Sequence, residues 1–75
     1  MADPKPPILH PHDLVWELGE NPGTTRLRRR SADVVAVFLH GYSMREIADA
    51  LECHIALIED AIRWEMKRRD RRARG

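Results

Sequence analysis

The sequence predicts a small all-α domain, and three features of residues 31–66 support this fold class. Apolar side chains recur at helical spacing in three consecutive stretches of this segment. Only short connections separate the stretches, at Gly41 and at residues 52–53. Ser43 stands three residues before Glu46, which is the spacing of a capping box at the start of a helix. Three helices with such short connections form a compact unit.

Residues 1–10 are expected to form a flexible, proline-rich arm, because prolines at positions 4, 6 and 7 fix φ and remove backbone donors. A short helix is expected to begin at Pro11 and to stop at Gly19. Its apolar face would consist of Leu14, Val15 and Leu18. Trp16 projects from a different side of this helix. We expect it to dock on the helical core rather than to contact a partner, because a small domain rarely leaves a tryptophan exposed.

The basic run at residues 26–30 follows a stretch, residues 20–23, that has the composition of a turn. The favoured interpretation is a helix that starts at residue 25 or 26 and continues to His40, because its apolar side chains can then share one face. The residues of that face are Leu27, Ser31, Val34, Val35 and Phe38. The alternative is a flexible basic arm, with Ser31 capping an independent helix.

The next two helices fit a helix-turn-helix at residues 43–65. Ile47, Ala48 and Leu51 fall on one face of the first, and the second begins near His54. This last helix carries two neighbouring apolar stripes, which together are wider than one packing partner would cover. The stripes are Ile55, Ile58, Ile62 and Met66, and beside them Leu57, Ala61 and Trp64. Either the short N-terminal helix or a second copy of the chain covers the remaining surface.

The segment 31–66, which is under half of the chain, resembles the trihelical helix-turn-helix of bacterial and phage transcription regulators, including the sigma-factor region that reads promoters. The matching residues are Gly41-Tyr42-Ser43, Arg45-Glu46-Ile47-Ala48, Leu51, Cys53 and Ile58. The resemblance implies that Ala48 allows close approach between helices and that Cys53 is a core residue. Such turns usually carry a glycine with positive φ, and Glu52 occupies that position here.

The net charge of +1 conceals a strong polarity along the chain. Residues 31–62 hold one arginine against six carboxylates, whereas residues 63–75 hold seven cations against two carboxylates. Four more arginines stand at residues 26–30. An acidic helical core therefore lies between two basic arms. Arms of this density bind polyanions through counterion release.

The sequence thus leads us to expect a small DNA-associated regulatory protein whose basic arms hold the phosphate backbone of double-stranded DNA. In the helix-turn-helix interpretation, Ser43 and Arg45 would contact phosphate, and residues 54–56 would face the groove. The expected DNA-binding residues are Arg26, Arg28, Arg29, Arg30, Ser43, Arg45, His54, Ile55, Ala56, Arg63, Lys67, Arg68, Arg69 and Arg71.

The competing hypothesis is a protein-protein interaction module that modulates a transcription or phage-assembly complex. Two carboxylates, Glu59 and Asp60, lie on the surface of the last helix that would face DNA, and carboxylates repel phosphates. Ile55 and Trp64 would supply apolar anchors for a protein partner beside them. Because a fold does not fix a function, the same helix-turn-helix serves either hypothesis.

Length and composition set further expectations. Seventy-five residues allow one domain with a small core, so a homodimer is expected. We divide the chain into the arm at 1–10, a helical domain at 11–70 and a basic tail at 71–75. No catalytic or phosphate-loop motif and no zinc-ligand spacing is present, so we expect neither an enzyme nor a metal or other cofactor. The single cysteine and the lack of a membrane-length apolar run favour a soluble, cytoplasmic protein without membrane contact.

Overall fold

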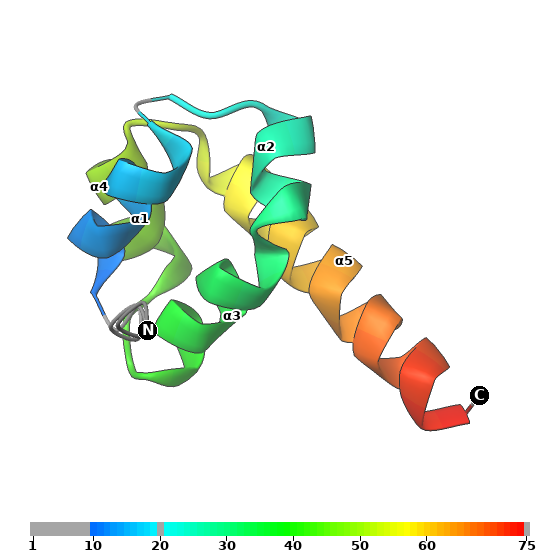
Figure 1. The fold of residues 1–75 in the computed structure, drawn as a ribbon. Helices are drawn as coiled ribbons and strands as arrows, with labels where there is room; N and C mark the ends of the chain where they lie inside the picture. Colours follow the sequence, from blue (N-terminus) through cyan, green and yellow to red (C-terminus); the bar gives the residue numbers. More distant parts are fainter. Residues whose placement is uncertain (1–9, 20, 75) are drawn as a thin grey trace, which may run out of the picture.

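The computed structural model describes residues 10–19 and 21–74, and this part of the chain folds into helices and short connections (Figure 1). The helices are α1 (Pro11–Leu18), α2 (Thr24–Arg29), α3 (Ser31–Leu39), α4 (Met44–Leu51) and α5 (Ile55–Arg74). No strand occurs in the described ranges, so the all-α prediction is confirmed. Apart from His10, the arm expected at residues 1–10 lies outside the described residues.

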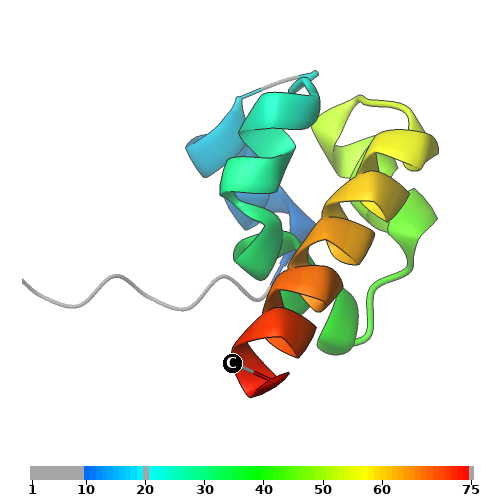
Figure 2. The same ribbon diagram turned by 90° about the vertical axis from the view of Figure 1, so that its right-hand side faces the viewer.

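The core lies where α5 packs against α2, α3 and α4, and Figure 2 shows α5 running between α2 and α4. The buried apolar residues are Leu14, Leu18, Leu27, Val34, Val35, Val37, Ile47, Ala48, Leu51, Ile58, Ala61 and Ile62. Helix α1 packs mainly against α4. The apolar surface of α5 is therefore covered by α2, α3 and α4, not by the N-terminal helix as one expectation had it, and Ile55, Trp64 and Met66 remain partly exposed. The second half of α5 projects beyond the other helices (Figure 1).

Helix α1 has the predicted boundaries, with Pro11 in its first turn and Gly19 as its C-cap at φ 74°. Its N-cap is His10, whose Nδ1 accepts a hydrogen bond from the backbone N–H of His12 at 3.1 Å. Asp13 completes a capping box by accepting the backbone N–H of His10 at 3.2 Å. The sequence argument did not identify this cap, because histidine is not among the usual N-cap residues.

The expectation that Trp16 docks on the core is wrong, because 90% of its surface is exposed. Leu14 and Leu18 are buried and fix the face that α1 turns inward. Trp16 lies two residues from each of them, which is about 200° around a helix of 3.6 residues per turn, so it points away from the core.

The single helix expected to reach His40 is instead divided at Arg30, whose φ of −112° and ψ of 23° are not helical. The basic run is therefore helical as α2, and Ser31 begins the separate helix α3. The shared inward face is nevertheless confirmed, since Leu27, Ser31 and Val34 are buried. The bend lets both α2 and α3 pack against α5 (Figure 1).

Helix α4, a three-residue turn and α5 form the predicted helix-turn-helix. The capping box is present: Ser43 Oγ accepts the N–H of Glu46, and Glu46 Oε1 accepts the N–H of Ser43, both at 3.1 Å. Glu52 ends α4 in the left-handed conformation, at φ 54° and ψ 41°, as the resemblance implied. Cys53 is half-buried and packs against the core. Helix α5 continues to Arg74, so most of the expected tail at 71–75 is helical.

Candidate nucleic-acid interface

The projecting half of α5 carries a row of cations on the side that faces away from the core. The members of this outer cationic row are Arg63, Lys67, Arg71 and Arg74, which recur at helical spacing and are all exposed. Arg74 pairs with Asp70 at 3.3 Å. Within residues 10–19 and 21–74, neither Lys67 nor Arg71 forms an ion pair. Their charges are therefore available to an anionic partner.

The structure places Arg28 in an internal ion pair rather than on an open arm. Its Nε and Nη2 donate to the two carboxylate oxygens of Asp60 at 3.0 and 2.9 Å. The guanidinium carbon lies 4.5 Å from the centroid of the Trp64 ring, which is a cation–π contact. The hydrogen bond from Arg28, against a smaller opposing effect of burial and helped by the charges of Arg28 and Arg63, lowers the pKa of Asp60.

This ion pair changes the charge of the surface that the sequence suggested would face DNA. Of the two carboxylates expected there, Asp60 is neutralised by Arg28, and Glu59 is exposed. Arg63, one turn beyond Glu59, is also exposed. Bidentate arginine–carboxylate pairs are strong, so the negative charge of Asp60 is offset by Arg28. The surface that favoured a protein partner is therefore less acidic than the sequence indicated.

Two further basic side chains lie beside a buried carboxylate, and of the two only Arg69 is hydrogen-bonded to it. Glu65 is only 6% exposed, and its Oε2 accepts a hydrogen bond from Arg69 Nε at 3.0 Å. Arg68 lies 3.7 Å from Oε1 of the same carboxylate. Ser31 Oγ donates to Oε1 at 3.0 Å. Burial alone raises the pKa of Glu65, but the hydrogen bonds from Ser31 and Arg69 and the charges of Arg68 and Arg69 outweigh it and lower that pKa.

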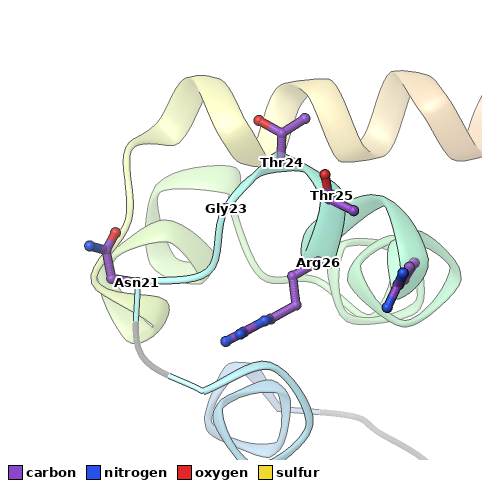
Figure 3. A pocket seen from close by; sticks show the side chains of 6 residues that line it. Asn21, Gly23, Thr24, Thr25 and Arg26 are labelled. Carbon is purple, nitrogen blue, oxygen red and sulfur yellow. The ribbon is translucent and has the colours of Figure 1, made fainter.

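The remaining arginines of the basic run have different positions. Arg26 donates from Nη1 to the carbonyl oxygen of Leu18 at 3.1 Å, and Figure 3 shows its side chain extending from α2 towards α1. Arg30 lies 3.8 Å from Asp33. Arg29 is exposed, and it lines the same hollow of about 470 Å³ as Arg26. Arg26 is thus a bridge between α1 and α2, whereas Arg29 faces solvent.

The residues expected to contact DNA are exposed at two places in the helix-turn-helix, the start of α4 and the start of α5. His54, Ile55 and Ala56 are exposed at the start of α5. His54 Nδ1 accepts the backbone N–H of Ala56 at 3.1 Å, so the imidazole caps the helix and leaves Nε2 for other partners. Ser43 and Arg45 are exposed at the start of α4, with the Ser43 hydroxyl engaged in the capping box.

Sequence reasoning missed Thr25, which lines a second hollow, between α2 and α5, together with Arg28, Arg29, Trp64 and Arg68. Asp60 and Trp64 were both noticed as surface residues of the last helix, and their spacing of four residues places them side by side. The sequence could not show that Arg28 contacts these two residues, because 32 residues separate Arg28 from Asp60.

No protein-family model matches this sequence, and neither a curated protein nor a solved structure is detectably similar to it. None of the described helices is long and apolar enough to cross a membrane. The described part of the chain also holds no group of three or more histidine, cysteine or acidic side chains arranged around a common metal position.

Proposed function

We propose that this chain is a small helix-turn-helix regulatory protein that associates with double-stranded DNA. The observation that carries the proposal is the outer cationic row on the projecting half of α5. Lys67 and Arg71 are exposed there without a carboxylate partner among the described residues. A helix that displays unpaired cations at helical spacing suits a phosphate backbone, because each contact releases condensed counterions.

The position of the row supports the proposal as much as its charge. The other end of the same helix begins with Ile55 and Ala56, directly after His54, and these three residues are exposed. A duplex that contacts the start of α5 could therefore also reach cations further along the helix. Arg45, exposed at the start of α4, would add a phosphate contact beside the groove.

The internal bonds of the basic residues narrow the expected set of phosphate contacts. Arg26, Arg28 and Arg69 bind the Leu18 carbonyl, Asp60 and Glu65, respectively. Arg26 thereby joins α2 to α1, Arg28 joins α2 to α5, and Arg69 stays within α5. The backbone contacts are assigned instead to Arg29, Arg45, Arg63, Lys67 and Arg71.

Binding of the purified protein to a mixed-sequence duplex, followed by fluorescence anisotropy across a salt series, tests the proposal. Binding with log K falling as log salt rises, at a slope of about −0.9 for each phosphate contacted, supports it. No binding even at low salt would refute it.

A protein partner is the second candidate, and Trp16 is the observation that favours it. Its side chain is 90% exposed on α1, where it has no role in the cationic surface. The partner surface expected on α5 is less acidic than the sequence indicated, because Asp60 pairs with Arg28, whereas Ile55 and Trp64 remain 39 and 41% exposed.

Dimerisation and a cytoplasmic location belong to the same proposal. Ile55 and Met66, on one side of α5, are 39 and 42% exposed, and Trp64, on the opposite side, is 41% exposed; a second copy of the chain could cover part of either surface. Sedimentation equilibrium of the full chain tests the dimer: a mass twice that of the 8.7 kDa chain supports it, and the monomer mass refutes it.

A further inference from the structure

The hollow between α2 and α5 has a composition that duplex backbone contacts do not explain. It is lined by Thr25, Arg28, Arg29, Trp64 and Arg68 and has a volume of about 390 Å³. Pockets that bind small organic groups measure roughly 300–1,000 Å³, so the space is sufficient for one such group. Trp64 lies at this hollow with 41% of its surface exposed.

Two flat groups form one wall of this hollow. The Arg28 guanidinium lies over the Trp64 ring at 4.5 Å, and Asp60 holds it there through two hydrogen bonds. The Nε/Nη2 edge of Arg28 is therefore already occupied by a carboxylate. Both side chains remain partly exposed, Trp64 at 41% and Arg28 at 40%, and the flat face of an indole or a guanidinium attracts another flat ring by stacking.

The rim of the hollow is cationic. Arg29 is exposed, and the Arg68 side chain is 45% exposed, with Glu65 no closer than 3.7 Å. The Thr25 hydroxyl adds a neutral hydrogen-bonding group. Two guanidinium groups and a hydroxyl beside a stacking surface match the two parts of a nucleotide, a flat base and an anionic phosphate.

We propose that this hollow binds one nucleotide unit of a single-stranded nucleic acid, with the base stacked against Trp64 and Arg28 and the phosphate held by Arg29 and Arg68. An acidic peptide suits the hollow less well, because it offers no flat ring to stack on Trp64 and because the charge of Arg28 is already paired with Asp60. The inference rests on the proposed function only in requiring a nucleic-acid partner, and it adds a preference for an unpaired base, which a closed duplex does not present.

The test compares an oligothymidylate single strand with a mixed-sequence duplex as probes. The chain has two tryptophans, so Trp16→Phe leaves Trp64 as the sole indole reporter. We expect the single strand to quench Trp64 fluorescence as it binds. Base stacking on an aromatic side chain contributes about 1–3 kcal/mol, so Trp64→Leu should weaken single-strand binding by about 5- to 150-fold. The same change should alter duplex binding by less than about twofold.

Two control variants accompany Trp64→Leu. Trp16→Leu removes an equally large ring from α1 and should leave single-strand affinity unchanged. Trp64→Tyr keeps a flat ring and should retain most of the affinity. Circular dichroism and thermal unfolding verify that each variant is folded. If Trp64→Leu does not fold, the quenching of Trp64 fluorescence in Trp16→Phe decides the test, and a single strand that binds without quenching overturns the inference.

The outcomes separate this inference from the proposed function. Salt-dependent duplex binding, combined with single-strand binding that is insensitive to Trp64, overturns the inference and leaves the proposed function standing. Single-strand binding that requires Trp64, without duplex binding, supports the inference and refutes the duplex proposal. Failure of both probes overturns both. Quenching of Trp64 by poly-glutamate as strong as that by oligothymidylate also overturns the inference, because it identifies a general anion or acidic-peptide surface.

Discussion

The hydroxyl of Ser31 donates a 3.0 Å hydrogen bond to Oε1 of Glu65, and this bond joins the first residue of α3 to the middle of α5. Both side chains are buried, at 0 and 6% exposure. The other oxygen of Glu65 accepts from Arg69 on the solvent side. A carboxylate at this depth is tolerated because its oxygens are satisfied from both directions. The bond also marks the point where the chain bends between α2 and α3.

Ser31→Ala should lower the free energy of unfolding by about 1–3 kcal/mol, because it leaves one oxygen of a buried carboxylate without its neutral donor. Urea unfolding followed by circular dichroism measures the change. Ser31→Ala combined with Glu65→Leu provides the control: once the carboxylate is gone, the serine change should cost much less. A Ser31→Ala protein as stable as wild type would contradict the role assigned to this bond.

Acid should destabilise the fold through Glu65 and Asp60. Their folded-state pKa values lie below the ordinary 4.5 and 3.8, so the folded state binds fewer protons than the unfolded state. The stabilisation is fully present above the ordinary values and is lost as the pH falls through the lowered ones. Urea unfolding at a series of pH values should show stability falling below about pH 4.5. Glu65→Gln and Asp60→Asn should each reduce this fall, and an unchanged acid profile in both variants would contradict the account.

Glu52→Gly should stabilise the protein by about 0.5–1 kcal/mol. The left-handed conformation at φ 54° costs a non-glycine residue about 1–2 kcal/mol, and the greater freedom of glycine in the unfolded chain offsets part of the gain. Thermal unfolding measures the effect. Asp49→Gly, in the interior of α4, is the matched control and should be destabilising by a comparable amount. A loss of stability in Glu52→Gly would show that its side chain has a role beyond the turn.

Truncating a side chain on the inner face of α1 should lower the free energy of unfolding, whereas truncating one on the outer face should leave it nearly unchanged. Leu14 is fully buried, so Leu14→Ala should cost about 2–5 kcal/mol. Trp16 is 90% exposed, so Trp16→Ala should change stability by no more than about 0.5 kcal/mol. Chemical denaturation of both variants measures the two changes in the free energy of unfolding. A large cost for Trp16→Ala would mean that the indole is buried in solution, for example against a second copy of the chain.

The features that sequence predicted well are those set by neighbouring residues. The Ser43–Glu46 capping box, the stop at Gly19 and the positive φ of Glu52 each depend on residues a few positions apart. Helical periodicity likewise identified the buried faces of the helices, because burial follows a repeat that can be read locally. The all-α fold class follows from these local signals.

The features that sequence did not predict depend on distant parts of the chain. The bend at Arg30 was missed because α2 and α3 must each pack against α5, which local periodicity does not reveal. Arg28 was expected on a phosphate-binding arm, but Asp60 binds it across 32 residues of chain. The exposure of Trp16 was missed because the prediction followed the general tendency of tryptophan to be buried. The position of Trp16 on the helix, opposite Leu14 and Leu18, indicates exposure instead.

The salt dependence of duplex binding by Lys67→Gln/Arg71→Gln tests the central claim most directly, because both cations are exposed and neither forms an ion pair among the described residues. Glu59→Gln, which adds the opposite charge change on the same helix, is the matched control. We predict that the double variant binds more weakly and that the slope of log K against log salt becomes shallower by about 2, one for each lost phosphate contact. Glu59→Gln should bind at least as tightly as wild type. An unchanged slope in the double variant would contradict the assignment of the outer cationic row to the phosphate backbone.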